Sequence, residues 1–246
     1  MNFYRKFFNL LLIPFLFCVS VANTANAQSP QPSTENYSKK LALTFDDSPN
    51  KTLREIISVY SRFNELNPDC PASATLFCSG HRITQKSSKT LQLAYASGFE
   101  LGNHGFSHRE LTYLSYPEIE KEIHSVDKLL QPIDGKQTHL FRAPYGSIND
   151  CVKKAVLSPI IDWSVDTKDW TGISTEKIVN CVLQGARDGG IILMHDGFEN
   201  TVTAVEKLLP LLKEQGYQVV TVSYLAEYNG CNLQVGGVYT RARKQK

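Results

Sequence analysis

The segment LALTFDDSP at residues 41–49 joins a strand-forming run to a pair of aspartates and a Ser-Pro turn. A short run of mostly apolar, β-forming residues that is closed by a turn signal is typical of a buried strand. Short apolar runs of this kind recur along the chain. The predicted strands cover residues 41–45, 74–77, 99–102, 139–141, 160–163, 191–194 and 219–222.

Helical stretches separate these runs. The clearest covers residues 117–130, where apolar residues recur at intervals of three and four and Ser115 with Glu118 forms a capping box. A second covers residues 202–215 and ends at Gly216. Alternation of strand and helix favours parallel strands joined by right-handed crossovers. We therefore expect an α/β fold of about seven parallel strands, closed or nearly closed into a barrel, with an open doubly wound sheet as the alternative.

Charged and polar residues follow several of the predicted strands. In a parallel barrel the carboxyl ends of all strands open onto one face, so residues that are scattered in the sequence converge there. The residues at these positions are Asp46, Asp47, His104, Arg142, Asp166, Asp169 and His195.

The Asp46-Asp47 pair together with His104 and His108 indicates a metal site. Two imidazoles and one carboxylate suit a divalent ion such as Zn²⁺, and three protein ligands leave a position open for water. The other aspartate can then take a proton, because consecutive residues leaving a strand point in different directions. The alternative is that the aspartates cap a turn and the histidines are ordinary loop residues.

Arg142 and His195 also lie at the predicted face of the site. A guanidinium there needs an acidic partner, and Asp46 is the natural candidate, with a purely structural ion pair as the alternative. His195 follows an apolar strand, where a histidine is usually part of the core. Its place at the mouth of the site favours a proton donor.

The amino end has the layout of a cleavable secretory signal. Arg5 and Lys6 precede an apolar run at 7–22, and Ala-Asn-Ala at 25–27 supplies a cleavage site. We expect residues 1–27 to be removed, leaving no stable membrane insertion, with a retained membrane anchor as the alternative. The expected parts of the chain are a signal peptide at 1–27, a flexible lead-in at 28–38, one domain at 39–228 and a C-terminal tail at 229–246.

The composition places few limits on the partners. The net charge is +2, from 26 basic and 24 acidic residues, so no strong field argues for nucleic acid as a partner. Five cysteines remain after signal cleavage, an odd number that leaves at least one free thiol. A disulfide between Cys151 and Cys181 is possible, but the sequence does not fix it.

The motifs at these positions match a known family. The chain resembles polysaccharide deacetylases of the NodB-homology type, grouped as carbohydrate esterase family four. The similarity spans about residues 39–227 and consists of five ordered motifs. They are residues 44–49 (TFDDSP), 103–108 (NHGFSH), 142–146 (RAPYG), 166–170 (DTKDW) and 193–196 (LMHD).

The resemblance implies a distorted (β/α) barrel that holds one divalent metal, usually Zn²⁺. The ligands would be Asp47, His104 and His108, Asp46 would be the general base, and His195 would protonate the leaving amine.

The same resemblance implies supporting roles for five further positions. Arg142 would orient Asp46, and Asp169 would tune His195. The backbone N–H of Tyr145 would help to hold the oxyanion. Trp170 and Leu193 would form a small apolar pocket for the acetyl methyl group.

Two positions depart from the usual motifs. Ser48 stands where the family usually has glycine, which raises a question about the backbone angles of the first motif. Gly105 replaces a serine or threonine whose hydroxyl braces the loop between the two histidines, so this loop is expected to be looser and metal affinity lower.

We therefore expect a metal-dependent enzyme that is exported to the cell envelope or secreted. It would remove the N-acetyl group of amino sugars in peptidoglycan, chitin-type glycans or exopolysaccharide. The alternatives are a hydrolase of another amide or ester on the same fold and a non-catalytic carbohydrate-binding protein. The barrel motifs fix the reaction, whereas the surrounding loops choose the glycan.

Overall fold

The computed structural model describes residues 37–243. The predicted signal peptide at 1–27 and nearly all of the predicted lead-in lie outside this range. Among residues 37–243, none of the helices combines the length and the apolar character that a membrane span needs.

Strands and helices alternate along the described chain, as predicted. The strands are β1 (Lys39–Ser48), β2 (Thr75–Cys78), β3 (Glu100–Asn103), β4 (Ile160–Ile161), β5 (Val165–Asp166), β6 (Gly190–His195), β7 (Tyr217–Val219) and β8 (Val238–Tyr239). The helices are α1 (Leu53–Leu66), α2 (Gln85–Ala96), α3 (Tyr116–Asp134), α4 (Asp150–Ala155), α5 (Thr175–Gly185), α6 (Glu199–Glu214) and α7 (Val222–Tyr228).

The strands pair in parallel around β1. The main sheet has the order β3-β2-β1-β6-β5, β7 also pairs with β1, and β4 pairs with β8. Single bridges join Phe141 to Asn103 of β3 and to Ile160 of β4. These bridges continue the parallel arrangement from β3 to β4, as a distorted barrel requires. The chain therefore has the expected α/β fold.

Several strands differ in extent from the prediction. The run at 139–141 forms only the bridges at Phe141, and the run at 160–163 is divided between β4 and β5. The run at 219–222 ends its strand early, because the Thr221 side chain accepts a hydrogen bond from the N–H of Tyr224 and caps α7. The short strand β8 lies in the stretch expected to be a tail, where Tyr239 and Ala242 are buried.

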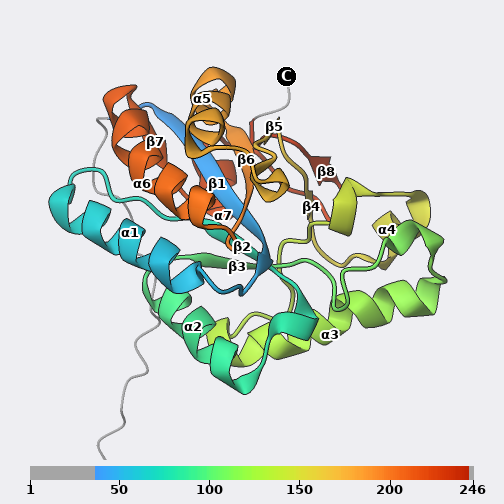
Figure 1. Ribbon diagram of the computed structural model, residues 1–246. Coiled ribbons are helices and arrows are strands. Elements are labelled where there is room, and N and C mark those ends of the chain that lie inside the picture. The colour runs from blue at the N-terminus through green and yellow to red at the C-terminus, as the bar shows by residue number, and fades with distance from the viewer. Residues whose placement is uncertain (1–36, 244–246) are drawn as a thin grey trace, which may run out of the picture.

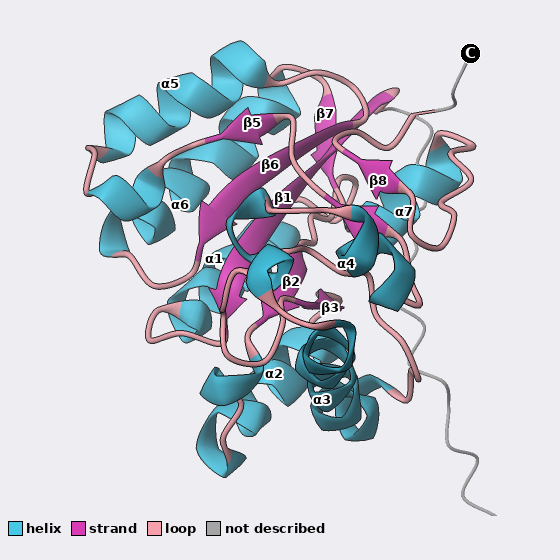
Figure 2. Ribbon diagram, turned by 90° about the vertical axis from the view of Figure 1, so that its right-hand side faces the viewer, coloured by secondary structure: helices cyan, strands magenta, loops and turns pink. Residues whose placement is uncertain are grey.

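Alternation along β1 separates its side chains between two apolar clusters. Leu41, Leu43 and Phe45 pack toward the helices, whereas Ala42 joins an inner cluster with Phe77. Figures 1 and 2 show α1, α5 and α6 on one side of β1 and β6. Since side chains alternate along a strand, Thr44 and Asp46 lie on the same inner face of β1 as Ala42. The carboxylate of Asp46 is therefore at the carboxyl end of β1, on the side of the sheet away from these helices.

All five cysteines among residues 37–243 are free thiols. The possible disulfide between Cys151 and Cys181 is not formed. The Cys181 thiol instead donates a hydrogen bond to the carbonyl of Asp166 at 3.5 Å.

Candidate active site

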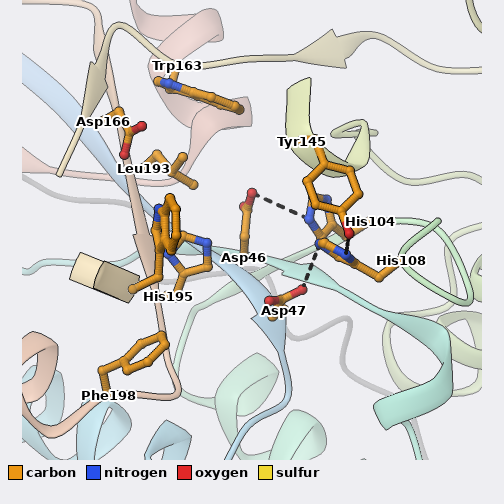
Figure 3. Close-up of a pocket in the computed structure, with 11 residues that line it drawn as sticks. Asp46, Asp47, His104, His108, Tyr145, Trp163, Asp166, Leu193, His195 and Phe198 are labelled. Atoms are coloured by element: carbon orange, nitrogen blue, oxygen red, sulfur yellow. Dashed lines mark hydrogen bonds and ion pairs between the residues drawn. The ribbon is translucent and has the colours of Figure 1, made fainter. Parts of the chain in front are cut away.

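A pocket of about 360 Å³ opens at the carboxyl ends of β1, β3, β5 and β6. Figure 3 shows Asp46 in its centre, between His195 on one side and the two metal-ligand candidates His104 and His108 on the other. The lining residues are Asp46, Asp47, His104, His108, Tyr145, Trp163, Asp166, Trp170, Leu193, His195 and Phe198.

Asp47, His104 and His108 meet at one point of this pocket. One ligand atom from each lies within 4.8 Å of the other two. His108 Nε2 is 3.2 Å from Asp47 Oδ1, and the Ser79 hydroxyl donates a hydrogen bond to the same oxygen at 3.3 Å. Two nitrogen donors and one carboxylate within this distance fit a tetrahedral divalent site with one position left for a water or a substrate oxygen.

In both imidazoles the Nδ1 atom, which faces away from the proposed metal, has a polar partner. His104 Nδ1 is 2.8 Å from the carbonyl of Arg142, and His108 Nδ1 is 3.3 Å from the hydroxyl of Tyr145. Burial lowers the pKa of His104, which favours the neutral ring whose Nε2 can bind a metal. Both rings therefore have a metal-binding nitrogen available and an orientation fixed from behind, as ligands of a divalent ion usually do.

Asp46 is buried and paired with a buried arginine. Arg142 Nη1 donates to Asp46 Oδ1 at 2.7 Å and to the hydroxyl of Thr44 at 2.7 Å. The rest of the guanidinium donates to the carbonyls of Ile161 and Asp162, and its carbon lies 4.0 Å from the centre of the Phe77 ring. This guanidinium therefore donates at least one hydrogen bond from each of its nitrogens. It fixes the carboxylate beside His104, whose Nε2 is 3.6 Å from Asp46 Oδ2.

His195 is held by the buried carboxylate of Asp169. Asp169 Oδ1 is 2.8 Å from His195 Nδ1, and Oδ2 accepts hydrogen bonds from the N–H of His195 at 2.8 Å and from the Thr201 hydroxyl at 2.7 Å. Burial lowers the pKa of His195, but the hydrogen bond to Asp169 and the charge of Asp46 outweigh it and raise the pKa above its ordinary value. A raised pKa favours the protonated ring, which can donate from Nε2.

The predicted substrate contacts also reach the pocket. Trp170 is half exposed on a short 3-10 helix, and Leu193 is buried on β6. Tyr145 has a φ of 61° and is 65% exposed, so its ring stands at the rim above His108. Arg142 and Asp169 lie behind the pocket wall, each in contact with a residue that lines it.

The sequence did not identify three of the lining residues as site residues. Asp166 stands out in the sequence only as a polar residue after a strand, and Trp163 is an isolated aromatic residue for which ordinary packing is a more common role than stacking on a sugar ring. Phe198 gave no signal, because an isolated phenylalanine before a helix resembles ordinary core. The structure places its ring against that of His195, with centroids 6.3 Å apart.

The two positions that depart from the family motifs, Ser48 and Gly105, differ in their backbone conformation. Ser48 does not adopt the left-handed backbone that would favour glycine, and the strained residue is its neighbour Asp47, with a φ of 62°. Gly105 does adopt a left-handed conformation, with a φ of 73°. Its loop is held by other contacts, since the Asn103 side chain accepts a hydrogen bond from the N–H of Gly105 at 3.0 Å and the Glu122 carboxylate accepts two from Ser107.

Comparison with known proteins identifies the family of this chain. The family model for polysaccharide deacetylase matches residues 33–158. The peptidoglycan-N-acetylmuramic acid deacetylase PdaC of Bacillus subtilis is 37% identical over 190 residues, which cover 77% of this chain and 39% of that protein. A peptidoglycan-N-acetylglucosamine deacetylase of Bacillus cereus is 35% identical over 202 residues, covering 78% of this chain and 91% of that protein.

A solved structure has the same fold. It is a family 4 acetyl xylan esterase from Clostridium thermocellum in complex with a cobalt ion, with a TM-score of 0.76 and 28% identity, covering 82% of this chain and 98% of that one. The matched family model, the sequence relatives and this likeness agree. The chain belongs to the polysaccharide deacetylase family.

Proposed function

We propose that this protein is an exported, metal-dependent enzyme that hydrolyses the N-acetyl group of amino sugars in a glycan and releases acetate. Relatives that act on peptidoglycan favour N-acetylglucosamine or N-acetylmuramic acid residues as the substrate class. Export rests on the predicted signal at residues 1–27, and Zn²⁺ is the metal that the donor set favours.

One observation carries this proposal. A three-ligand cluster, an arginine-paired carboxylate and an aspartate-paired imidazole all face one pocket. Amide hydrolysis needs an electrophilic centre, a proton acceptor for the attacking water and a proton donor for the leaving nitrogen. The pocket offers one group for each task, which favours hydrolysis over carbohydrate binding alone.

The residues divide the work as follows. Asp47, His104 and His108 would hold a divalent ion, which would supply the positive charge that polarises the acetyl carbonyl and activates water. Asp46 accepts the proton of the attacking water, and Arg142 keeps that carboxylate in place. Deleting an oxyanion donor typically costs about 100- to 1000-fold in rate, so the N–H of Tyr145 would be a substantial contributor.

The leaving group departs on the other side of the pocket. His195, whose protonated form is favoured by the hydrogen bond to Asp169, gives its proton to the amine nitrogen as the tetrahedral intermediate collapses. Trp170 and Leu193 surround the acetyl methyl group and exclude larger acyl groups.

The test is acetate release by the full chain from peptidoglycan, chitooligosaccharides and acetylated xylan. Release from an N-acetylated glycan, lost with a chelator and restored by Zn²⁺, is the expected result. His195→Ala should retain zinc and lose most of its turnover. Activity in His195→Ala equal to that of the unaltered protein would remove this residue from the mechanism, and zinc binding without acetate release from any glycan would support a non-catalytic binding protein.

The likeness to an acetyl xylan esterase supports a second candidate, hydrolysis of O-acetyl esters at the same site. An alkoxide leaving group depends less on a proton donor than an amine does. The His195→Ala variant should therefore lose far more activity on an N-acetyl glycan than on acetylated xylan, and higher turnover of the unaltered protein on acetylated xylan would favour this candidate.

A further inference from the structure

The loop that carries both imidazoles contains one residue, His108, in an unfavourable backbone conformation. Gly105 has a φ of 73° and His108 a φ of 57°. A non-glycine residue in the left-handed region costs on the order of 1 kcal/mol, so His108 keeps this conformation only if its surroundings impose it. Gly105 has no side chain to contribute.

Glu122 of α3 supplies this hold. Its Oε2 accepts a hydrogen bond from the N–H of Ser107 at 2.7 Å, and its Oε1 accepts one from the Ser107 hydroxyl at 2.7 Å. Both short bonds reach the residue directly before His108. Arg109, directly after His108, donates to Glu122 Oε1 at 3.2 Å and to the Ser107 hydroxyl at 3.2 Å. The residues on either side of the ligand are thus tied to one carboxylate.

This carboxylate is buried and charged. Only 6% of Glu122 is exposed. Burial raises the pKa of Glu122, but the hydrogen bonds from Ser107 and Arg109 outweigh it and hold the pKa below its ordinary value. Charge-assisted bonds to a carboxylate on a long helix are shorter and stiffer than neutral ones, so they suit a group that fixes geometry.

The other end of the loop is anchored to the same helix. Asn103, directly before His104, donates to the carbonyl of Ile123 at 2.8 Å and to Asp127 Oδ1 at 3.0 Å. Helix α3 therefore holds the loop at both ends, through neighbouring turns, while both ligands lie between the anchors. The relative position of the two imidazoles depends on a helix that does not itself reach the pocket.

We propose that Glu122 is a positioning residue for the metal, which presets His108 through Ser107 and Arg109 so that little reorganisation accompanies metal binding. The inference rests on the proposed metal site. Removing a partner behind a metal ligand typically weakens metal affinity about 10- to 100-fold. Glu122→Gln keeps the size of the side chain but presents an amide –NH₂ where Ser107 and Arg109 need an acceptor, so it should weaken zinc binding within that range.

The experiment measures zinc affinity of the full chain by competition with a chromogenic chelator, at a temperature where all variants are folded. Glu120→Gln, a change of a partly exposed glutamate on the same helix, is the matched control and should bind zinc like the unaltered protein. Ser107→Ala removes the hydroxyl that bonds Glu122 and Arg109 but keeps the backbone N–H bond to Glu122, so it should give a smaller loss than Glu122→Gln. It also provides the test if Glu122→Gln does not fold.

A positioning role is distinguished from a purely structural one by excess zinc. With the ligands unchanged, acetate release by Glu122→Gln should recover most of its rate at saturating zinc. If folded Glu122→Gln binds zinc as tightly as the unaltered protein, the inference is wrong and the proposed function still stands. Ser107→Ala gives the same test if Glu122→Gln does not fold. Failure of the unaltered protein to bind zinc would overturn both the inference and the proposed function.

Discussion

Raising the pH from 6 to 9 should destabilise the fold through one buried histidine. His139 is 3% exposed, with Nδ1 2.8 Å from Asp127 Oδ1 and Nε2 3.1 Å from Asp134 Oδ2. Both ring nitrogens face carboxylates, which matches the doubly protonated ring. Burial lowers the pKa of His139, but the hydrogen bonds to the two aspartates outweigh it and raise the pKa from 6.5 to about 8.

The magnitude follows from this shift. A rise from 6.5 to about 8 corresponds to about 2 kcal/mol of folding free energy. Because the folded state binds the proton more tightly, the contribution is complete below the unfolded pKa and is lost as the pH rises through the folded one. About half should remain near pH ~7.2, and almost none near pH ~9.

The assay is urea unfolding followed by circular dichroism at several pH values between 6 and 9. A chelator is present throughout, since protons displaced by metal binding would add their own pH dependence. The comparison is with His139→Gln, which cannot take up the proton, and the difference between the two unfolding free energies should shrink by about 2 kcal/mol across this range. His124→Gln, on the same helix as the two aspartates, is the control and should follow the unaltered protein. A difference that stays constant with pH would refute the reasoning.

Three further predictions concern the pocket. Asp169→Asn should move the basic limb of the kcat/KM profile to lower pH, because it removes the carboxylate that raises the pKa of His195; activity measured from pH 6 to 10 checks this, and an unmoved limb would count against His195 as the donor. Arg142→Met should lower the free energy of unfolding by about 3–5 kcal/mol, because it leaves Asp46 buried without its partner. Urea unfolding at pH 7 measures this loss, and a loss below about 1 kcal/mol would contradict the prediction. Trp170→Ala should raise the KM for a chitooligosaccharide while unfolding changes by less than about 0.5 kcal/mol, because the side chain is half exposed; an unchanged KM would remove it from the substrate contacts.

The sequence predicts what depends on local pattern. Strand β1 and the aspartates after it follow from an apolar run ended by polar residues, and the parallel topology follows from the alternation of strand and helix. The convergence of His104 and His195 required only that parallel strands end on one face. Those positions needed no knowledge of side-chain packing.

Contacts that depend on packing between distant elements were not predictable. Glu122 gives the same sequence signal as any polar residue in a helix, and only the packing of α3 against β3 brings its carboxylate to Ser107. The ring of Phe198 and the two-residue strand β8 were missed for the same reason, since a single aromatic or a two-residue run shows no periodicity. The expectation of a looser ligand loop at Gly105 stays a prediction, but it was made without the contacts that Asn103 and Glu122 make to this loop.

Asp46 and His195, the proposed base and acid, have partners of opposite charge. Asp46 is backed by a guanidinium that is 1% exposed, and His195 by a carboxylate that is 0% exposed. Water screens neither pair well, so the attraction within each pair is stronger than it would be at the protein surface. The hydrogen bond to Asp169 raises the pKa of His195 and so favours the protonated ring, while Arg142 holds the carboxylate of Asp46 in position. These opposite environments favour the roles of base and acid for two groups that share one pocket. Arg142 and Asp169 would thus set the direction of proton movement without touching the substrate.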